Sequence, residues 1–216
     1  MNLLAEHEAY WDKVAETKEF PVPFEIDLFQ QYVSKEMMIL EIGCGYGRIL
    51  NNLFNTGFSN LVGIDISQNM INRGLRHYPY LDLRKTTGGE LAFPENTFHA
   101  VILIAVLTCI PENEEQYKMM SAIFRVLKSE GVLYIHDCML NKDQRNIDRY
   151  ELYKDKYGEY GVFELTEGSV MRHHTKEHID KLTKIFHREH FVSSEHTTMN
   201  GNRTNGFCYI GRKKEV

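Results

Sequence analysis

An apolar strand that runs directly into three alternating glycines constrains the fold of this chain most. Residues 38–48 read Met-Ile-Leu-Glu-Ile-Gly-Cys-Gly-Tyr-Gly-Arg, with Gly43, Gly45 and Gly47 after the apolar run. Glycine permits a tight strand-to-helix turn and lets the backbone approach a ligand closely. The spacing differs from the G-x-G-x-x-G of dinucleotide sites, and no lysine follows as in a phosphate-binding loop. The segment therefore predicts a ligand site at a strand tip, with a purely structural turn as the alternative.

Short apolar runs alternate with longer polar stretches of helical period up to Asp137. This alternation predicts a parallel sheet with crossover helices, for which a doubly wound α/β fold is the economical solution. A glycine, Gly131, follows the third predicted helix and is expected to cap it. The predicted strands are residues 38–42, 61–64, 81–84, 100–105 and 131–136, and the predicted helices are residues 48–55, 68–76 and 114–127.

The pattern changes after Asp137. Residues 139–174 are polar and rich in tyrosine, which predicts an insertion over one edge of the sheet. Residues 175–187 then predict a helix with Thr175 as its N-cap. Residues 191–198 and 204–212 predict a β-hairpin around an Asn-Gly pair. No repeat or low-complexity linker divides the chain, so residues 1–216 are expected to form one domain.

An acid stands at the end of the second predicted strand. Asp65 follows Leu-Val-Gly-Ile and lies eighteen positions beyond Gly47. An acid in this place can accept hydrogen bonds from both ribose hydroxyls of a nucleoside that lies across the strand tips. Capping of the helix that begins near Ser67 is the alternative role, and the two roles are compatible.

Four sequence blocks occur in a fixed order. They are Leu-Glu-Ile-Gly-Cys-Gly-Tyr-Gly at 40–47, Gly-Ile-Asp-Ile-Ser-Gln-Asn-Met at 63–70, Leu-Ala-Phe-Pro-Glu-Asn-Thr-Phe at 91–98, and Phe-Arg-Val-Leu-Lys-Ser-Glu-Gly at 124–131. Together they resemble the class I S-adenosylmethionine-dependent methyltransferases, in particular their small-molecule, UbiE-like branch (methyltransferase type 11). The resemblance covers residues 10–137. It implies a Rossmann-like, doubly wound seven-stranded sheet, mostly parallel, with an antiparallel C-terminal hairpin strand.

The resemblance implies S-adenosylmethionine as the cofactor and assigns residues to it. The methionine part would lie over the glycine turn with Glu41 beneath it, Asp65 would bind the ribose, and Ile66 would pack on the adenine. Residues 1–36 would form a helical segment that covers the cofactor. The full set of implied cofactor residues is Tyr10, Glu41, Gly43, Cys44, Gly45, Gly47, Asp65, Ile66, Met70, Thr87, Gly88 and Ala105.

Two positions depart from the family pattern. Thr87 stands where many relatives carry the acid that receives the adenine amino group, which leaves the Thr87 hydroxyl, the Gly88 amide and Glu90 as alternatives. Residues 107–111 read Leu-Thr-Cys-Ile-Pro where relatives often carry paired histidines. No catalytic role can be transferred from those histidines.

Histidine is the side chain best suited to accept a proton from an acceptor near neutral pH. His136 closes the fifth predicted strand, and His173 and His174 precede the last predicted helix, so these three are the candidate catalytic residues. A satisfied core histidine is the alternative for His136. At most one of His173 and His174 should face a pocket, because neighbours in an extended segment point opposite ways. Six further histidines, including His7 and His196, cluster with neither acids nor glycines and receive no role.

The insertion at 139–174 is the candidate acceptor site. Its aromatic residues recur at three- and four-residue spacing, which predicts either a lid over the acceptor or an ordinary apolar helix face against the sheet. The candidate substrate residues are Tyr153, Tyr157, Tyr160 and Phe163. His174 and His178 are four apart, but they have no committed third ligand, so no metal is expected.

Composition limits the possible partners and locations. The net charge is −5 and the 25 lysines and arginines are scattered, which disfavours nucleic acid. The four cysteines are far apart without a C-x-x-C pair, which favours a reducing, cytoplasmic setting. No signal peptide or membrane span is indicated, and nothing indicates an oligomeric state.

The predicted function is transfer of a methyl group from S-adenosylmethionine to an oxygen, nitrogen or sulfur atom of a small molecule. A nucleic-acid or protein methyltransferase and a non-catalytic cofactor-binding subunit are the alternatives.

Overall fold

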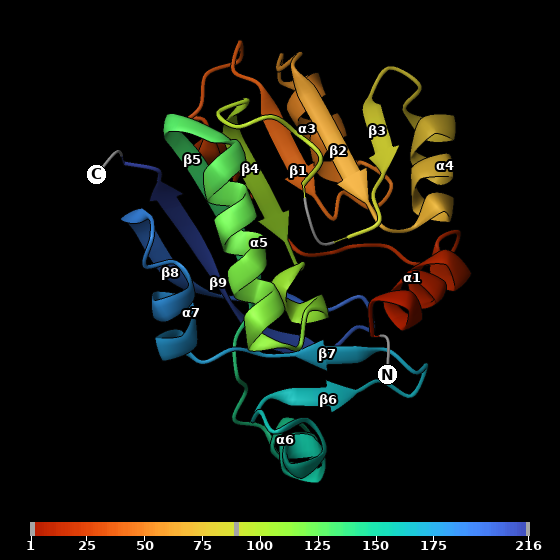
Figure 1. Cartoon of the computed structure of the whole chain (residues 1–216). Helices are drawn as coiled ribbons and strands as arrows, with labels where there is room; N and C mark the ends of the chain where they lie inside the picture. Colours follow the sequence, from red (N-terminus) through yellow and green to blue (C-terminus); the bar gives the residue numbers. More distant parts are fainter. Residues whose placement is uncertain (1–2, 89–90, 215–216) are drawn as a thin grey trace.

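The computed structural model describes residues 3–88 and 91–214 of the 216-residue chain. A seven-stranded sheet with the order β3-β2-β1-β4-β5-β9-β8 runs through it, and β6 and β7 form a separate two-stranded sheet (Figure 1). The strands are β1 (Ile39–Ile42), β2 (Leu61–Asp65), β3 (Asp82–Lys85), β4 (Phe98–Ile104), β5 (Leu127–Cys138), β6 (Val162–Glu164), β7 (Val170–Arg172), β8 (His187–Thr197) and β9 (Arg203–Arg212). The helices are α1 (Leu3–Val14), α2 (Ile26–Phe29), α3 (Arg48–Asn55), α4 (Gln68–His77), η1 (Leu107–Cys109), α5 (Asn113–Val126), α6 (Gln144–Tyr157) and α7 (Lys176–Leu182).

The strand directions confirm the expected topology. β3, β2, β1, β4 and β5 pair in parallel, whereas β9 pairs antiparallel with both β5 and β8. Every residue of the interior strand β1 is buried, as expected for a parallel strand that is covered on both faces. The fold is therefore the Rossmann-like, doubly wound sheet with an antiparallel C-terminal hairpin strand.

Helices cover both faces of this sheet. Apolar residues of α5 and α7 belong to one core cluster, and those of α2, α3 and α4 belong to another. Figure 1 shows α5 and α7 in front of the sheet and α3 behind it. The carboxyl ends of the parallel strands are left without a covering helix of these two layers. Figure 1 places α1 at this edge, with α6, β6 and β7 below it.

The boundary between α5 and β5 differs from the prediction. Gly131 was expected to cap the helix, but α5 ends at Val126, and Leu127 is already extended and pairs with Phe98 of β4. The left-handed backbone angle falls instead on Glu130, with φ of 60°. The helix predicted at 175–187 is likewise shorter. Helix α7 ends at Leu182, and His187 already belongs to β8.

Other local predictions are confirmed. The Thr175 side chain accepts a hydrogen bond from the His178 backbone N–H and caps α7. The C-terminal hairpin turns at Asn200-Gly201, where Gly201 has a φ of 78°. Within residues 3–88 and 91–214, no helix has both the length and the apolar character that crossing a bilayer requires.

Candidate functional site

The glycine turn after β1 is tied to the tip of β2. Gly43 and Gly45 have φ of 69° and 53°, in the left-handed region that favours glycine. The Gly45 N–H donates to Asp65 Oδ2 over 2.8 Å. A Cβ atom at Gly45 would lie 2.8 Å from the Phe20 ring. The turn therefore needs glycine both for its backbone angle and for its close packing.

Two buried acids lie beside this turn. Asp65 also accepts a hydrogen bond from the Ser67 N–H at Oδ1 over 2.8 Å, and burial raises its pKa. Each carboxylate oxygen can accept a second bond, so Asp65 keeps capacity for a ligand. Glu41 is 3% exposed and its Oε2 has no hydrogen-bond partner. Burial raises the pKa of Glu41 well above its usual range, and the charge of Arg48 opposes this rise.

A cavity of about 1750 Å³ opens over these residues. This volume exceeds the roughly 300–1,000 Å³ of a typical ligand pocket, so it has room for two small molecules. We call the part at the ends of β1, β2 and β3 the cofactor half. Its lining residues include Glu41, Gly43, Cys44, Gly45, Asp65, Ile66, Met70, Thr86, Gly88 and Ala105.

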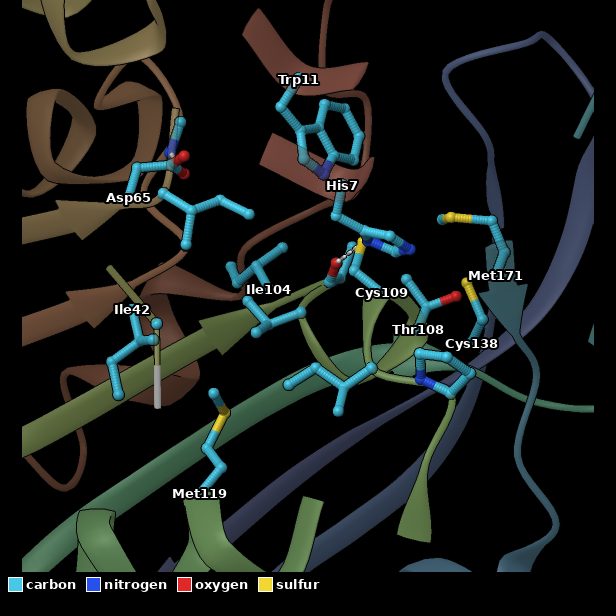
Figure 2. A pocket seen from close by; sticks show the side chains of 18 of the residues that line it. His7, Trp11, Ile42, Asp65, Ile104, Thr108, Cys109, Met119, Cys138 and Met171 are labelled. Carbon is cyan, nitrogen blue, oxygen red and sulfur yellow. Dashed lines mark hydrogen bonds between the residues drawn. The ribbon is translucent and has the colours of Figure 1, made fainter. Parts of the chain in front are cut away.

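The cavity continues along the sheet edge toward β5 and β9. We call this part the acceptor half, and Figure 2 shows its Thr108, Cys138 and Met171 on the side away from Asp65. Its lining residues include Thr108, Cys109, Cys138, Arg145, Arg149, Phe163, Met171, His173, His196, Thr198, Asn200, Asn202 and Thr204. Burial raises the pKa of the Cys109 and Cys138 thiols, which keeps them protonated.

Helix α1 covers the junction of the two halves. His7 and Trp11 line the cavity from α1, and Figure 2 shows both over its centre. The neighbouring Tyr10 does not line the wall, because its hydroxyl donates to Glu167 Oε2 over 2.9 Å. Glu167 lies in the connection between β6 and β7 and also pairs with Lys18 at 3.3 Å. These bonds fasten the N-terminal segment to the insertion.

Most of the cofactor residues expected from the sequence come together in the cofactor half. Gly47 does not line it, because a Cβ there would meet Leu81 and Leu83 at 3.1 Å, so this glycine serves packing. Thr87 is also absent from the wall, whereas the adjacent Thr86 and Gly88 line it. Glu90, the third alternative for the adenine contact, lies outside the described residues.

The three candidate catalytic histidines are separated by the fold. His136 is fully buried away from the cavity, because its Nε2 pairs with Ser194 Oγ across the sheet at 3.1 Å. His174 also lies outside the cavity wall, with Nδ1 3.1 Å from the Cys138 carbonyl and Nε2 2.9 Å from Gln116 Nε2. Of these three candidates, His173 alone lines the acceptor half, in agreement with the expectation that at most one of His173 and His174 faces a pocket.

The tyrosines of the insertion mostly face elsewhere. Phe163 lines the acceptor half, but Tyr153, Tyr157 and Tyr160 do not. The Tyr157 hydroxyl donates to Glu164 over 2.7 Å, and its ring neighbours that of Tyr153. Tyr160 packs its ring edge against Tyr150. Helix α6 packs against β6 and turns another side to the cavity, so Tyr153 and Tyr157 do not reach the cavity wall.

Several lining residues were missed by sequence reasoning. His7 and His196 line the cavity, although the sequence alone assigns neither of them a role. The signal for His7 was its position four residues before Trp11 on one amphipathic helix, which puts both side chains on one face. Arg145 and Arg149 line the acceptor half from α6 and share the same four-residue spacing. No comparable sequence pattern marks His196, which is brought to the cavity by the pairing of β8 with β9.

Asp137 is a further buried acid at the end of β5. Its carboxylate accepts the Thr108 backbone N–H at 3.2 Å and the Cys138 N–H at 2.7 Å. Burial raises the pKa of Asp137 to about 7. These bonds hold η1 against β5 and so fix the wall that carries Thr108 and Cys109. In the described parts of the chain, no three histidine, cysteine or acidic side chains gather into a metal site.

The cofactor half fits S-adenosylmethionine. The unpartnered Oε2 of Glu41 is suited to a cationic group such as the methionine ammonium. Asp65 at the tip of β2 is suited to ribose hydroxyls, and Ile66, Leu91 and Phe93 offer an apolar wall for a base.

Comparison with known proteins agrees with this geometry. Residues 40–135 match the family described as "Methyltransferase domain". The chain is 29% identical over 117 residues to sterol 24-C-methyltransferase erg6 of Aspergillus fumigatus, covering 51% of this chain and 30% of that protein. It is 27% identical over 115 residues to eEF1A lysine and N-terminal methyltransferase of Mus musculus, covering 49% of this chain and 16% of that protein. The matched segment thus spans less than a third of these two relatives.

A solved structure extends the similarity over nearly the whole chain. A SAM-dependent methyltransferase from Methanosarcina mazei superimposes with a TM-score of 0.84 at 25% identity, covering 90% of this chain and 99% of that one. The match to a methyltransferase domain thus covers residues 40–135, and over nearly its whole length the chain has the fold of a SAM-dependent methyltransferase; both findings imply S-adenosylmethionine as the cofactor.

Proposed function

We propose that this protein transfers the methyl group of S-adenosylmethionine to a small molecule bound in the acceptor half. The observation that carries the proposal is the single cavity that joins the glycine turn and Asp65 to a second, differently lined compartment. The inserted segment at 139–174 supplies part of the second compartment through Arg149, Phe163 and His173. A concave compartment with apolar and polar side chains on its wall suits a small molecule better than a folded macromolecule.

Alignment of the reactants is the main task of the residues described. The cofactor, when bound, supplies a sulfonium methyl group that is already activated for displacement. Holding an acceptor atom in line with that methyl group can contribute on the order of 7–11 kcal/mol to lowering the barrier. The glycine turn and Asp65 would fix one reactant, and the acceptor half would fix the other. Trp11 and the apolar wall around Met171 would exclude water.

His7 is the side chain that we propose as a base for a protonated acceptor. Its Nε2 has no hydrogen-bond partner, although the residue is 3% exposed. Burial lowers the pKa of His7, and a hydrogen bond with the Val170 backbone opposes this shift. Because Nε2 is unpartnered, Nδ1–H makes the bond to the Val170 carbonyl. Nε2 therefore keeps its lone pair at neutral pH.

Other residues on the cavity wall are proposed to bind the cofactor or the acceptor. We propose that Glu41, Asp65, Ile66, Met70 and the glycine turn bind the cofactor, since all line the cofactor half. We propose that His173 and Phe163 bind the acceptor. A cytoplasmic location stays a prediction that the cysteine spacing favours.

A transfer assay tests the proposal against its alternatives. The protein is incubated with S-adenosylmethionine labelled in the methyl group and with a cell extract that is separated afterwards into small molecules, proteins and nucleic acids. We expect label in the small molecules. Label confined to proteins or nucleic acids would identify the alternative enzyme, and binding without transfer would identify a non-catalytic subunit. Asp65→Ala serves as the control that should transfer much less label when S-adenosylmethionine is kept below saturation.

A further inference from the structure

Arg149 places a positive charge on the cavity wall, and no ion pair with an acid is found for it among the described residues. Its side chain is half-buried, and its Nε has no hydrogen-bond partner. Burial lowers the pKa of Arg149, and the charge of Arg145 adds to this shift, whereas a hydrogen bond with the Tyr150 side chain and the more distant charge of Asp143 oppose it. Removing a charge from water is unfavourable unless an opposite charge or hydrogen bonds replace the lost hydration.

The Phe163 ring fixes the position of this guanidinium. The central guanidinium carbon of Arg149 lies 3.4 Å from the centre of the ring. The His173 ring packs edge-on against the same phenyl ring, with 5.0 Å between ring centres. Stacking on an aromatic face leaves the edge of a guanidinium free to donate hydrogen bonds. Arg149 and His173 therefore both pack on the Phe163 ring in the acceptor half, which places them close together.

The neighbours of His173 determine which of its nitrogens carries the hydrogen. Asn141 Oδ1 accepts the Asn205 backbone N–H over 2.8 Å, which identifies the other amide atom as nitrogen. That nitrogen donates to His173 Nδ1 over 3.1 Å. The Tyr150 oxygen accepts the Asn141 backbone N–H and a hydrogen bond from Arg149, and its own hydrogen has His173 Nδ1 at 2.6 Å and Asn146 Oδ1 only at 3.4 Å, so it too donates to His173.

His173 is therefore a hydrogen-bond donor toward the cavity. Because Nδ1 accepts, the neutral ring carries its hydrogen on Nε2. Among the described residues, Nε2 has no partner of its own, and His173 lines the acceptor half. An Nε2–H group cannot take a proton from an acceptor, but it can donate to an oxygen atom.

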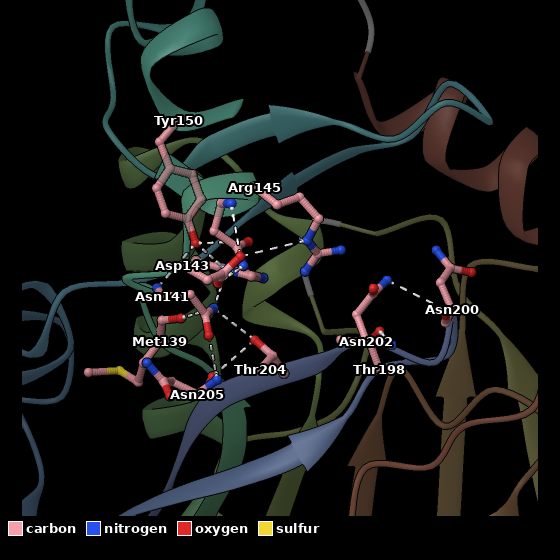
Figure 3. A network of polar contacts seen from close by, with 12 residues as sticks. Met139, Asn141, Asp143, Arg145, Tyr150, Thr198, Asn200, Asn202, Thr204 and Asn205 are labelled. Atoms are coloured by element: carbon pink, nitrogen blue, oxygen red, sulfur yellow. Dashed lines mark hydrogen bonds and ion pairs between the residues drawn. The ribbon is translucent and has the colours of Figure 1, made fainter. Parts of the chain in front are cut away.

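Arg145 brings a second guanidinium to the same compartment. Its nearest acid is Asp143, at 3.9 Å. Asp143 is already engaged as the N-cap of α6, where it accepts the Asn146 N–H over 3.2 Å. Figure 3 shows Arg145 extending from the start of α6 toward the side of the hairpin that carries Asn202. Asn202 lines the same cavity.

The acids on the nearby cavity wall have other partners. Glu164 accepts the Tyr157 hydroxyl over 2.7 Å and pairs with Lys156. Glu167 accepts the Tyr10 hydroxyl and pairs with Lys18. Neither acid forms an ion pair with Arg149, so the charge at the acceptor half stays positive.

We propose that the acceptor half binds an anionic group, a carboxylate or a phosphate, of the molecule that receives the methyl group. Arg149 and the His173 Nε2–H bind the anion directly, and Arg145 adds charge. The planar fork of a guanidinium matches two oxygens of either group. This inference rests on the proposed function, since it names the chemical class of the acceptor in the same cavity.

Matched probes test the anion site. The protein saturated with S-adenosylhomocysteine is titrated by calorimetry with benzoate, with phenyl phosphate and with benzamide, a neutral match for benzoate. We expect at least one anion to bind about tenfold tighter than benzamide, because hydrogen bonds to charged groups are stronger than those to neutral ones. Preference for benzoate identifies a carboxylate site, and preference for phenyl phosphate identifies a phosphate site.

Variants assign the preference to the proposed residue. Arg149→Gln should remove the preference for the anion and leave benzamide binding unchanged, whereas Arg149→Lys should keep part of the preference. Arg188→Gln is the matched control, because Arg188 is an exposed arginine outside the cavity wall that pairs with Asp180. It should behave as the parent does. S-adenosylhomocysteine affinity and the circular dichroism spectrum show whether each variant is folded.

The outcomes separate this proposal from the proposed function. Equal affinity for all three probes, no binding of either anion, or an unchanged preference in Arg149→Gln overturns the anion site. If Arg149→Gln fails to fold, Arg149→Met is titrated in its place. A full preference for the anion in Arg149→Met with a parental circular dichroism spectrum then overturns the anion site. The anion site is likewise overturned if Arg149→Lys and the parent show the same preference for the anion at tenfold higher salt. Failure of the parent to bind S-adenosylhomocysteine overturns the proposed function, and titration of the cofactor-free protein still tests the anion site.

Discussion

Glu41→Gln should make the cofactor-free protein more stable while weakening cofactor binding. Glu41 is 3% exposed, its Oε2 has no partner, and burial raises its pKa well above the ordinary value of 4.5. For an acid whose folded pKa lies above its unfolded pKa, the folded state is most stable below the unfolded value and loses stability as the pH rises through the folded value. Each unit of difference costs about 1.4 kcal/mol at higher pH.

The size of the effect follows from removing this charge. Glutamine keeps the shape of the side chain, so at pH 8 the variant should gain about 1–3 kcal/mol in free energy of unfolding, the usual penalty of an unsatisfied buried group. The gain should be smaller at pH 5, where more of the buried carboxyl is protonated. Loss of a charged partner for the methionine ammonium should weaken S-adenosylhomocysteine binding by about 10- to 150-fold, or roughly 1.5–3 kcal/mol.

Urea denaturation at pH 5 and pH 8 measures the stability, and calorimetry measures the affinity. The exposed Glu36→Gln is the matched control and should change neither. A cofactor-free Glu41→Gln that is less stable than the parent at pH 8 would contradict a destabilising buried charge at Glu41, and parental affinity for S-adenosylhomocysteine would contradict its role in binding the ammonium.

Three further perturbations probe the same cavity. Asp65→Ala should weaken S-adenosylhomocysteine binding by about 10- to 150-fold in calorimetry, and parental affinity in the folded variant would contradict a role in ribose binding. Gly45→Ala should lose about 1–2 kcal/mol of stability in urea and the thermal shift induced by the ligand, since its φ is 53° and its Cβ would meet Phe20. Gly158→Ala, with φ of 69° and open space around its Cβ, is the control that should keep the ligand shift. His7→Ala should remove the fall of the rate in acid, which we expect below pH 6.5 because the pKa of His7 is lowered; an unchanged acid limb would exclude His7 as the base.

The sheet and the cofactor half could be predicted because their signals are local. Three glycines in left-handed or close-packed positions and an acid at a strand tip are fixed by backbone geometry, and Gly43, Gly45 and Asp65 do meet at one strand edge. The C-terminal hairpin was equally readable from its Asn-Gly turn. The cap expected at Gly131 failed because the pairing of Leu127 with β4 ends the helix earlier than its own pattern does.

The acceptor half could not be predicted because its residues meet only through tertiary packing. His173 reaches the wall while its neighbour His174 turns inward to Gln116, and which of the two does so depends on how β7 joins α7. The tyrosine spacing in the insertion describes a real helix, but the side of α6 that faces the cavity carries Arg145 and Arg149. The spacing of His7 and Trp11 puts both on one face of α1, but no local pattern specifies where that face docks.

A crystal structure with bound S-adenosylhomocysteine would show whether the two halves of the cavity hold the two reactants of a methyl transfer. We predict the ribose hydroxyls on Asp65, the methionine part over Gly43 and Gly45 with its ammonium toward Glu41, and the sulfur facing open space toward His7 and the acceptor half. A ligand bound elsewhere, or a sulfur that faces a wall closed off from the acceptor half, would contradict a methyl transfer between the two halves of this cavity.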